Sequence, residues 1–206
     1  MELVRRLAYE ADYVIAVDRG AQVLRLAGVE PDVFCGDDDS ASGEDASWAH
    51  QVATRDILYP SEKYATDLSL AIDCARHEAA RRSAGLAITV TCATGGRLDH
   101  QLAVLGLLAK NADANPRIVE DGLEYRILSP DGTRSWDVGS CAEVGATFSA
   151  LALEEGALVS EKGMRWELDR HRFSLLDDLG VSNVILSPDA TVTCDEGVVA
   201  AFLLNR

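Results

Sequence analysis

Acidic, basic and glycine residues gather in four short clusters in the first half of the sequence. The clusters are Asp18-Arg19-Gly20, Gly36-Asp37-Asp38-Asp39-Ser40, Lys63-Tyr64-Ala65-Thr66-Asp67 and Gly95-Gly96-Arg97-Leu98-Asp99-His100. Each cluster comes directly after a stretch with the pattern of a β-strand or begins a stretch with the pattern of a helix. Because the carboxyl ends of parallel strands share one edge of a sheet, where ligands bind, we expect the four clusters to converge.

The second cluster has the composition of a metal site. Asp37 and Asp39 alternate, so in an extended segment both side chains face the same way. Carboxylates held close together repel one another unless a cation lies among them. Oxygen ligands suit Mg²⁺, which takes one or two carboxylates together with phosphate oxygens. Taken alone, however, an acidic run is more often a solvated turn, so the cluster by itself leaves both interpretations open.

The fourth cluster combines features that favour an anion. Gly95 and Gly96 let the backbone approach a ligand closely, and the helix that follows offers free N–H groups to phosphate. Arg97 could add a bidentate contact to the same phosphate. Asp99 and His100 could support these groups or act as a base. They are also consistent with a helix-opening acid beside a surface histidine.

The remaining clusters each have two interpretations. Lys63 could hold phosphate and Asp67 could bind a metal ion, whereas Thr66 at this place is also an ordinary helix N-cap. Asp18, directly followed by Arg19 and Gly20, could likewise contribute to the site or simply end a strand.

The elements that must position these residues change in kind at about residue 121. Before it, strand-like stretches such as 14–17, 31–36 and 86–92 alternate with helical periodicity over 66–83 and 98–111. We therefore predict an α/β domain over residues 1–121, with a mostly parallel sheet in a Rossmann-like three-layer arrangement. Residues 122–206 carry short strand-like pieces separated by turn signals, which predicts an all-β sandwich or barrel.

Composition limits the classes of function. Lys plus Arg number 19 and Asp plus Glu number 34, a formal net charge of −15. This charge argues against binding to nucleic acid or to an anionic membrane surface, because both require a basic face. The five cysteines show no C-x-x-C pair and no secretory leader is visible, so we expect a reduced cytoplasmic protein with buried thiols.

In this order, the four clusters resemble those of the thiamine pyrophosphokinase family. That family shows D-x-G, G-D-x-D-S, K-x-x-T-D and G-G-R-x-D-H, followed later by G-x-x-W/Y-x-L and S-N. The later motifs match Gly163-Met164-Arg165-Trp166-Glu167-Leu168 and Ser182-Asn183. The resemblance extends from about residue 14 onwards. Counting the G-x-x-W/Y-x-L segment with the S-N that follows it as one motif, five motifs in order are far more specific than any one of them.

The resemblance implies an ATP-dependent diphosphotransferase. Such an enzyme transfers the diphosphoryl group of ATP to the thiamine hydroxyl, with Mg²⁺ as cofactor, usually as a homodimer of chains that each carry an α/β domain and a β-sandwich. The residues that it implies at the site are as follows: catalytic, Asp37, Asp39, Asp67 and Asp99; metal, Asp37, Asp39 and Asp67; ATP or phosphate, Asp18, Gly20, Lys63, Thr66, Gly95, Gly96, Arg97 and His100; thiamine, Ser182 and Asn183.

The sequence also departs from the family's pattern at three places. The family usually has a strand and a glycine-containing loop before the first helix, whereas this sequence begins at that helix, so part of the nucleotide pocket is expected to differ. Asp38 stands where an apolar residue is usual, and Tyr64 where an acidic residue or Asn is common. Two alternatives therefore stand beside the kinase: a diphosphokinase acting on another hydroxymethyl acceptor such as a pterin, and a catalytically silent protein that binds thiamine or nucleotide.

Overall fold

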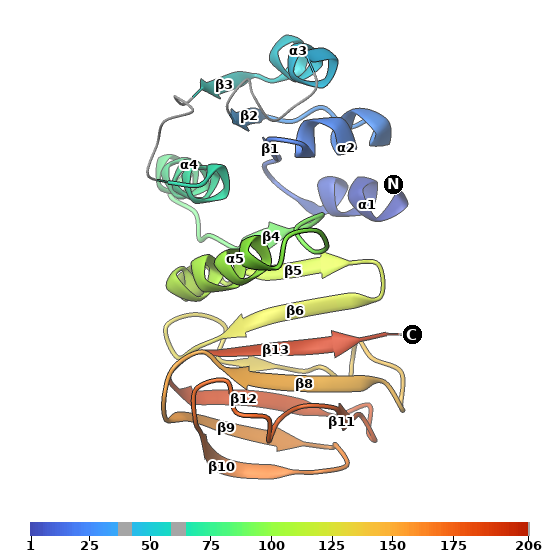
Figure 1. Ribbon diagram of the computed structural model, residues 1–206, viewed down its shortest axis with the longest axis vertical. Helices are drawn as coiled ribbons and strands as arrows, with labels where there is room; N and C mark the ends of the chain where they lie inside the picture. The colour runs from blue at the N-terminus through green and yellow to red at the C-terminus, as the bar shows by residue number, and fades with distance from the viewer. Residues whose placement is uncertain (37–42, 59–64, 206) are drawn as a thin grey trace. The chain divides into compact units, whose positions relative to one another are not determined.

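The structure is a computed structural model that describes residues 1–36, 43–58 and 65–205. These residues form two compact units, Met1–Leu86 and Ala87–Arg206, which Figure 1 shows in blue to green and in green to red. The predicted domain boundary at residue 121 falls inside the second unit, between two of its strands, and stays a prediction.

The first unit contains a three-stranded parallel sheet with helices. In chain order its elements are α1 (Glu2–Glu10), β1 (Ile15–Val17), α2 (Gly20–Ala27), β2 (Val33–Gly36), α3 (Gly43–Val52), β3 (Arg55–Leu58) and α4 (Asp67–Arg82). The strands lie in the order β1-β2-β3, so β2 is central and its neighbours are paired with it in parallel.

Helices cover both faces of this sheet because its short strands are apolar on both sides. Ala16 and Phe34 point to one face and pack with buried residues of α1, α2 and α3. Val33 and Cys35 point to the other face and pack with Ala71 and others of α4. A run of consecutive apolar residues is the expected pattern for a parallel strand buried on both faces, so the layering follows directly from the sequence.

The second unit is mainly antiparallel. Its elements are β4 (Thr89–Val90), α5 (Leu98–Lys110), the 3-10 turn η1 (Ala112–Ala114), β5 (Arg117–Glu120), β6 (Leu123–Leu128), β7 (Ser135–Trp136), β8 (Thr147–Ala152), β9 (Ala157–Lys162), β10 (Leu168–Phe173), β11 (Asn183–Val184), β12 (Thr191–Glu196) and β13 (Val199–Leu204). One sheet has the order β11-β8-β13-β6-β5-β4 and the other the order β10-β9-β12-β7.

The two sheets of the second unit enclose one apolar core. Residues from both contribute, among them Phe148 of β8, Val159 of β9 and Trp136 of β7, all nearly inaccessible to solvent. Figure 1 shows β5, β6, β13 and β8 side by side, with the last strand of the chain in the interior of its sheet. Among the described strand pairs of this unit, β4–β5 is parallel and the others are antiparallel.

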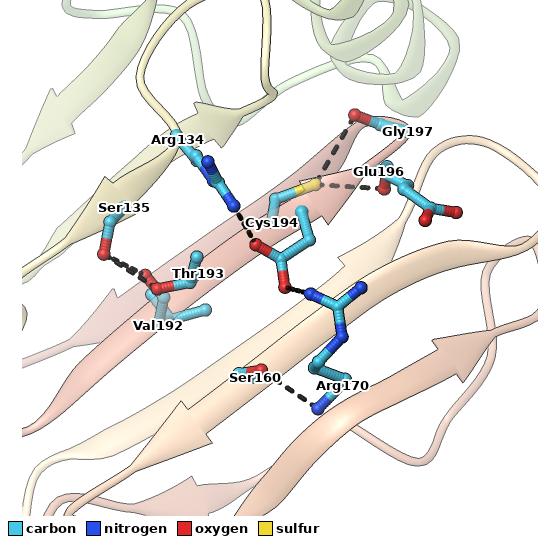
Figure 2. Close-up of polar contacts among 10 residues, drawn as sticks. Arg134, Ser135, Ser160, Arg170, Val192, Thr193, Cys194, Glu196 and Gly197 are labelled. Atoms are coloured by element: carbon cyan, nitrogen blue, oxygen red, sulfur yellow. Dashed lines mark hydrogen bonds and ion pairs between the residues drawn. The ribbon is translucent and has the colours of Figure 1, made fainter.

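The outer face of the four-stranded sheet is polar. Both carboxylate oxygens of Asp195 are paired, one with Arg134 and the other with Arg170. Figure 2 shows these two arginines reaching toward β12 from opposite sides, while the Cys194 thiol donates to the carbonyls of Glu196 and Gly197. Strand alternation therefore divides this sheet into an apolar inner face and a charged outer face.

The predicted succession of a parallel sheet with helices and then antiparallel sheets is confirmed. Three local features differ from the sequence prediction. The strand predicted over 86–92 is only two residues long, because β4 lies at the end of its sheet and pairs with β5 alone. Helix α3 was not predicted. Strand β5 also pairs antiparallel with β6, which joins the predicted α/β segment to the β-rich segment in one sheet.

The cysteines are partly as predicted. None of the five, all of which are described, forms a disulfide; Cys35, Cys74 and Cys194 are buried as expected, whereas Cys92 and Cys141 are exposed. Among the helices in the described part of the chain, none is long and apolar enough to cross a membrane.

Candidate functional site

The carboxyl edge of the three-stranded sheet brings predicted site residues together. Asp18 follows β1 in a left-handed backbone conformation, and its amide donates to the carbonyl of Cys35 at 3.1 Å. Its Oδ1 lies so close to Gly36 that a Cβ built there would be 2.8 Å away. Gly20 begins α2 two residues further on. The first cluster and the start of the second are therefore neighbours in space.

The third cluster reaches the same edge. Thr66 is the N-cap of α4, and its hydroxyl accepts from the amide of Ser69 at 3.3 Å. Asp67 begins the helix, and its carbonyl accepts a contact from the Cys35 thiol at 3.7 Å. Asp18 and Asp67 thus both lie beside the end of β2, where the chain continues into Asp37.

Three of the predicted site residues lie outside the part of the chain that the structure describes. Asp37 and Asp39, the two principal metal candidates, lie outside the described residues, and so does Lys63. Within residues 1–36, 43–58 and 65–205, no three His, Cys, Asp or Glu side chains are grouped so that they could hold a metal ion. The predicted set of Asp37, Asp39 and Asp67 has one described member, Asp67.

The fourth cluster lies in the second unit and forms the turn between β4 and α5. Gly95 and Gly96 have φ angles of +87° and +76°, a region that side chains with a Cβ rarely adopt. Both glycines are exposed, and α5 begins two residues later. The double glycine is therefore needed for the chain to turn into the helix, whether or not it also faces a ligand.

Arg97 and Asp99 form a forked ion pair in this turn. The guanidinium donates to both carboxylate oxygens, at 3.1 and 2.6 Å, and both side chains are largely exposed. The hydrogen bonds from Arg97, with a smaller contribution from the His100 backbone, lower the pKa of Asp99 to about 2. Asp99 is therefore an anion at neutral pH and pairs with Arg97 at the helix N-terminus.

Glu120 was not identified from the sequence. It ends β5, and its Oε1 accepts from the amides of Ala93 at 2.8 Å and Thr94 at 3.3 Å, directly before the double glycine. The carboxylate thereby fixes the approach to the turn. A glutamate after a short apolar strand is common in sequences, so no sequence signal distinguishes this one.

The predicted thiamine residues lie in the β-sandwich. Ser182 is exposed and has a φ angle of +62°, and its amide donates to the Ser149 hydroxyl. Asn183 is only 3% exposed. Its Nδ2 donates to Glu161 and to the carbonyl of Trp166, each at 2.7 Å, and its Oδ1 accepts from the amides of Trp166 and Val184. Both donors and both lone pairs of the amide are thus engaged inside the protein.

The G-x-x-W segment is the loop between β9 and β10, and it lies beside Ser182-Asn183. Gly163 has a φ angle of +70°, and a Cβ there would be 2.8 Å from the Cα of Ala190, so only glycine fits without strain. Trp166 is 57% exposed, whereas Trp136 is 2% exposed and belongs to the core. Of these two tryptophans, Trp166 alone is exposed, and the guanidinium of Arg165 lies 5.6 Å from the centroid of its ring.

Comparison with known proteins gives two family matches. The profile described as "Thiamin pyrophosphokinase, catalytic domain" matches residues 4–119. The profile described as "Thiamin pyrophosphokinase, vitamin B1 binding domain" matches residues 138–199. The two matches follow the order of the α/β and β-rich segments and together span most of the chain.

Individual relatives agree with the profiles. The chain is 35% identical over 186 residues to thiamine pyrophosphokinase of Bacillus subtilis, covering 90% of this chain and 84% of the relative. The crystal structure of thiamin pyrophosphokinase from Geobacillus thermodenitrificans has a TM-score of 0.75 at 28% identity, covering 93% of this chain and 86% of that one. That from Candida albicans has a TM-score of 0.79 at 16% identity, covering 100% and 86%, and supports the fold alone.

Proposed function

Because the chain belongs to the thiamin pyrophosphokinase family, we propose that it transfers the diphosphoryl group of ATP to the hydroxyl of thiamine. The products are thiamine diphosphate and AMP. The observation that carries this function is the match to both family profiles, in order, over residues 4–119 and 138–199. The vitamin B1 binding profile favours thiamine over a pterin as acceptor.

We assign the metal site to Asp37, Asp39 and Asp67, with Asp18 beside them. The support is the placement of the described members: Asp18 and Asp67 both lie at the end of β2, from which Asp37 follows. Oxygen donors of this kind fit Mg²⁺, which also binds phosphate oxygens. When bound, Mg²⁺ would neutralise charge on the triphosphate and align it for in-line attack at the β-phosphorus.

We assign the phosphate contacts to Lys63, Thr66 and the Gly95-Gly96-Arg97 turn. The family motifs add Gly20 and His100 to this set. The N-terminus of α5 supplies backbone N–H groups, and Arg97 is held there by Asp99. An ionised Asp99 cannot donate a proton, so its role is to orient Arg97 or to accept the proton of the thiamine hydroxyl.

We assign the thiamine site to the surface around Ser182 and Trp166, with Asn183 beneath it. The exposed indole of Trp166 provides a flat face for the aromatic rings of thiamine, and the positive thiazolium favours such a face. We also propose a cytoplasmic homodimer; a monomeric mass in light scattering at micromolar concentration would contradict the dimer.

The reaction is tested by incubating the purified protein with thiamine, ATP and Mg²⁺ and identifying the products by mass spectrometry. A matched sample contains EDTA in place of Mg²⁺. We expect thiamine diphosphate and AMP in the first sample and neither in the second. Thiamine monophosphate with ADP would move the attack to the γ-phosphorus, and binding of thiamine without any product would instead support the silent binding protein.

A further inference from the structure

A glutamate lies in the core of the β-sandwich. Glu161 is on β9, and its exposed fraction is 0%. Its neighbours Ser160 and Lys162 belong to the outer face; the Ser160 hydroxyl accepts from the backbone amide of Arg170 there, as Figure 2 shows. Alternation along the strand therefore directs the Glu161 carboxyl inward, toward the facing sheet.

Glu161 connects the two sheets through a chain of hydrogen bonds that ends at the thiamine loop. Its Oε2 accepts from Nδ2 of Asn183 on β11 at 2.7 Å, and both side chains are buried. Asn183 in turn forms two hydrogen bonds with the backbone of Trp166: it donates to the carbonyl and accepts from the amide. The buried carboxyl group of Glu161 is thus linked through Asn183 to the backbone of an exposed tryptophan.

The carboxyl group is only half satisfied. Its Oε1 is buried and has no hydrogen-bond partner among the described residues. A buried carboxylate with one donor is costly, because the charge loses its hydration without full compensation. Burial accordingly raises the pKa of Glu161 to about 7, against the smaller opposing effect of the hydrogen bond from Asn183.

No described titratable group compensates this carboxyl. Its partners in the sheet are Leu168 on β10 and Val192 on β12. The inward thiol of Cys194 on β12 stays neutral, since burial raises its pKa to about 12. From the facing sheet, Arg126 on β6 lies over the ring of Trp136 and is already paired with Glu124.

We propose that Glu161 is a positioning residue for the thiamine site, holding Trp166 in place through Asn183 while its carboxyl is protonated; this rests on the function proposed above. The neutral carboxyl accepts the bond from Asn183 at little cost. The ionised carboxylate gains hydration for Oε1 when the sheets or the loop separate enough for water to enter. That opening breaks the link to Asn183 and releases the Trp166 backbone, so thiamine binding weakens as the pH rises through neutrality.

The first test follows Trp166 without substrate. Tryptophan emission is recorded from about pH 6 to 8.5 in the wild type and in Trp166→Phe, and their difference isolates Trp166. The same pair is measured on a Glu161→Gln background, where the side chain keeps the acceptor but cannot ionise. We expect the Trp166 emission to change with pH when Glu161 is present and to stay constant with Gln. A pH-independent signal in the wild type, or the same transition with Gln, would overturn the proposal.

The second test measures the KM for thiamine and the KM for ATP at the same pH values. If only the protonated form is competent, the wild-type KM for thiamine rises about 30-fold from pH 6 to 8.5, because the protonated fraction of a group with a pKa of about 7 falls by that factor. Glu161→Gln should show no such rise, and the ratio of the two proteins removes any titration of the substrates themselves. The KM for ATP should be the same in the wild type and in Glu161→Gln at each pH.

The matched control is Glu143→Gln, which makes the same change of charge at an exposed position of the same unit and should follow the wild type. A parallel pH dependence of the KM for thiamine in wild type and Glu161→Gln would refute the positioning role. Failure of the proposed function is recognised separately: no thiamine diphosphate is formed at any pH, while the Trp166 emission still reports on Glu161.

Discussion

Two carboxyl groups of this chain lie in opposite environments, and their pKa values shift in opposite directions. Asp99 is exposed and paired with Arg97, which lowers its pKa to about 2. Glu161 is buried with one hydrogen bond, which raises its pKa to about 7. The G-G-R-x-D-H motif predicts a site role for Asp99, whereas no motif indicates Glu161. Glu161 stands in an ordinary alternating strand, and only the long-range pairing with Asn183 makes it unusual.

The buried carboxyl makes stability depend on pH. Because the pKa is higher in the folded state than the ordinary value of 4.5, the contribution of Glu161 to stability is fully present below about pH 4.5. It is lost as the pH rises through 7. The difference in unfolding free energy between Glu161→Gln and the wild type should therefore change with pH. It should shift by about 3 kcal/mol in favour of Glu161→Gln from pH 4.5 to pH 8, since each pKa unit corresponds to about 1.4 kcal/mol. Urea unfolding at both pH values measures this; an equal difference at the two would contradict it.

The metal assignment predicts the effect of one substitution. Asp39→Asn keeps the size of the side chain but removes a negative charge, so turnover should fall at least about 100-fold, the scale of losing one charge-stabilising group. Asp131→Asn, at an exposed turn between β6 and β7, is the control and should keep full activity. The assignment fails if Asp39→Asn is folded, by circular dichroism and unfolding midpoint, and turns over at the wild-type rate.

Among the helices and strands, those with long apolar side chains on one face or a capping signal were predicted, whereas helix α3 was missed and strand β4 was predicted too long. Helix α4 has a capping Thr66 and ends close to the predicted Ser83. Helix α3 escaped because its buried apolar face consists of Ala46 and Ala49, which give little hydrophobic contrast. Strand β4 was overestimated because an apolar sequence predicts burial, whereas the length of a strand depends on its pairing partners.

The start of α4 offers a test of a cap against a ligand contact. The Thr66 hydroxyl accepts from the Ser69 amide, and replacing such a cap with Ala costs about 1 kcal/mol. Thr66→Ala should therefore lower the denaturant midpoint, and Thr66→Ser should restore it. If Thr66 also contacts phosphate, the KM for ATP rises with Ala and recovers with Ser. An unchanged midpoint in Thr66→Ala would show that the cap adds nothing measurable.

For the molecule as a whole, the sequence predicted a parallel sheet with helices followed by antiparallel strands. It did not predict that strands of the two segments pair in one sheet. Alternating strands and helices before residue 121 and turn-rich strands after it indicated the succession. The pairing of β5 with β6 and of β6 with β13 links residues up to about 80 positions apart, and no local pattern reveals it. Contacts between residues far apart in the sequence also build the site. The order of the motifs therefore indicated the function, whereas no single cluster showed which residues lie together in the site.

The thiols probe the packing of both units at once. Cys92 and Cys141 are exposed, and Cys35, Cys74 and Cys194 are buried. A thiol reagent should therefore modify two cysteines in the native protein and all five after unfolding. Cys141 should react before Cys92, because burial of the sulfur raises the pKa of Cys92 and lowers its thiolate fraction. Rapid reaction of more than two thiols under native conditions would contradict this packing.

The central place of β13 bears on how the chain is made. This strand, the last in the sequence, lies between β6 and β8 and supplies hydrogen bonds to both. Synthesis proceeds from the N-terminus, and earlier domains fold first. The three-stranded sheet of the first unit can form during translation, but the six-stranded sheet has an open centre until Val199–Leu204 have left the ribosome. The first unit can therefore complete its sheet earlier than the second. A chain that ends anywhere before β13 leaves the edges of β6 and β8 unpaired, and unpaired strand edges promote aggregation.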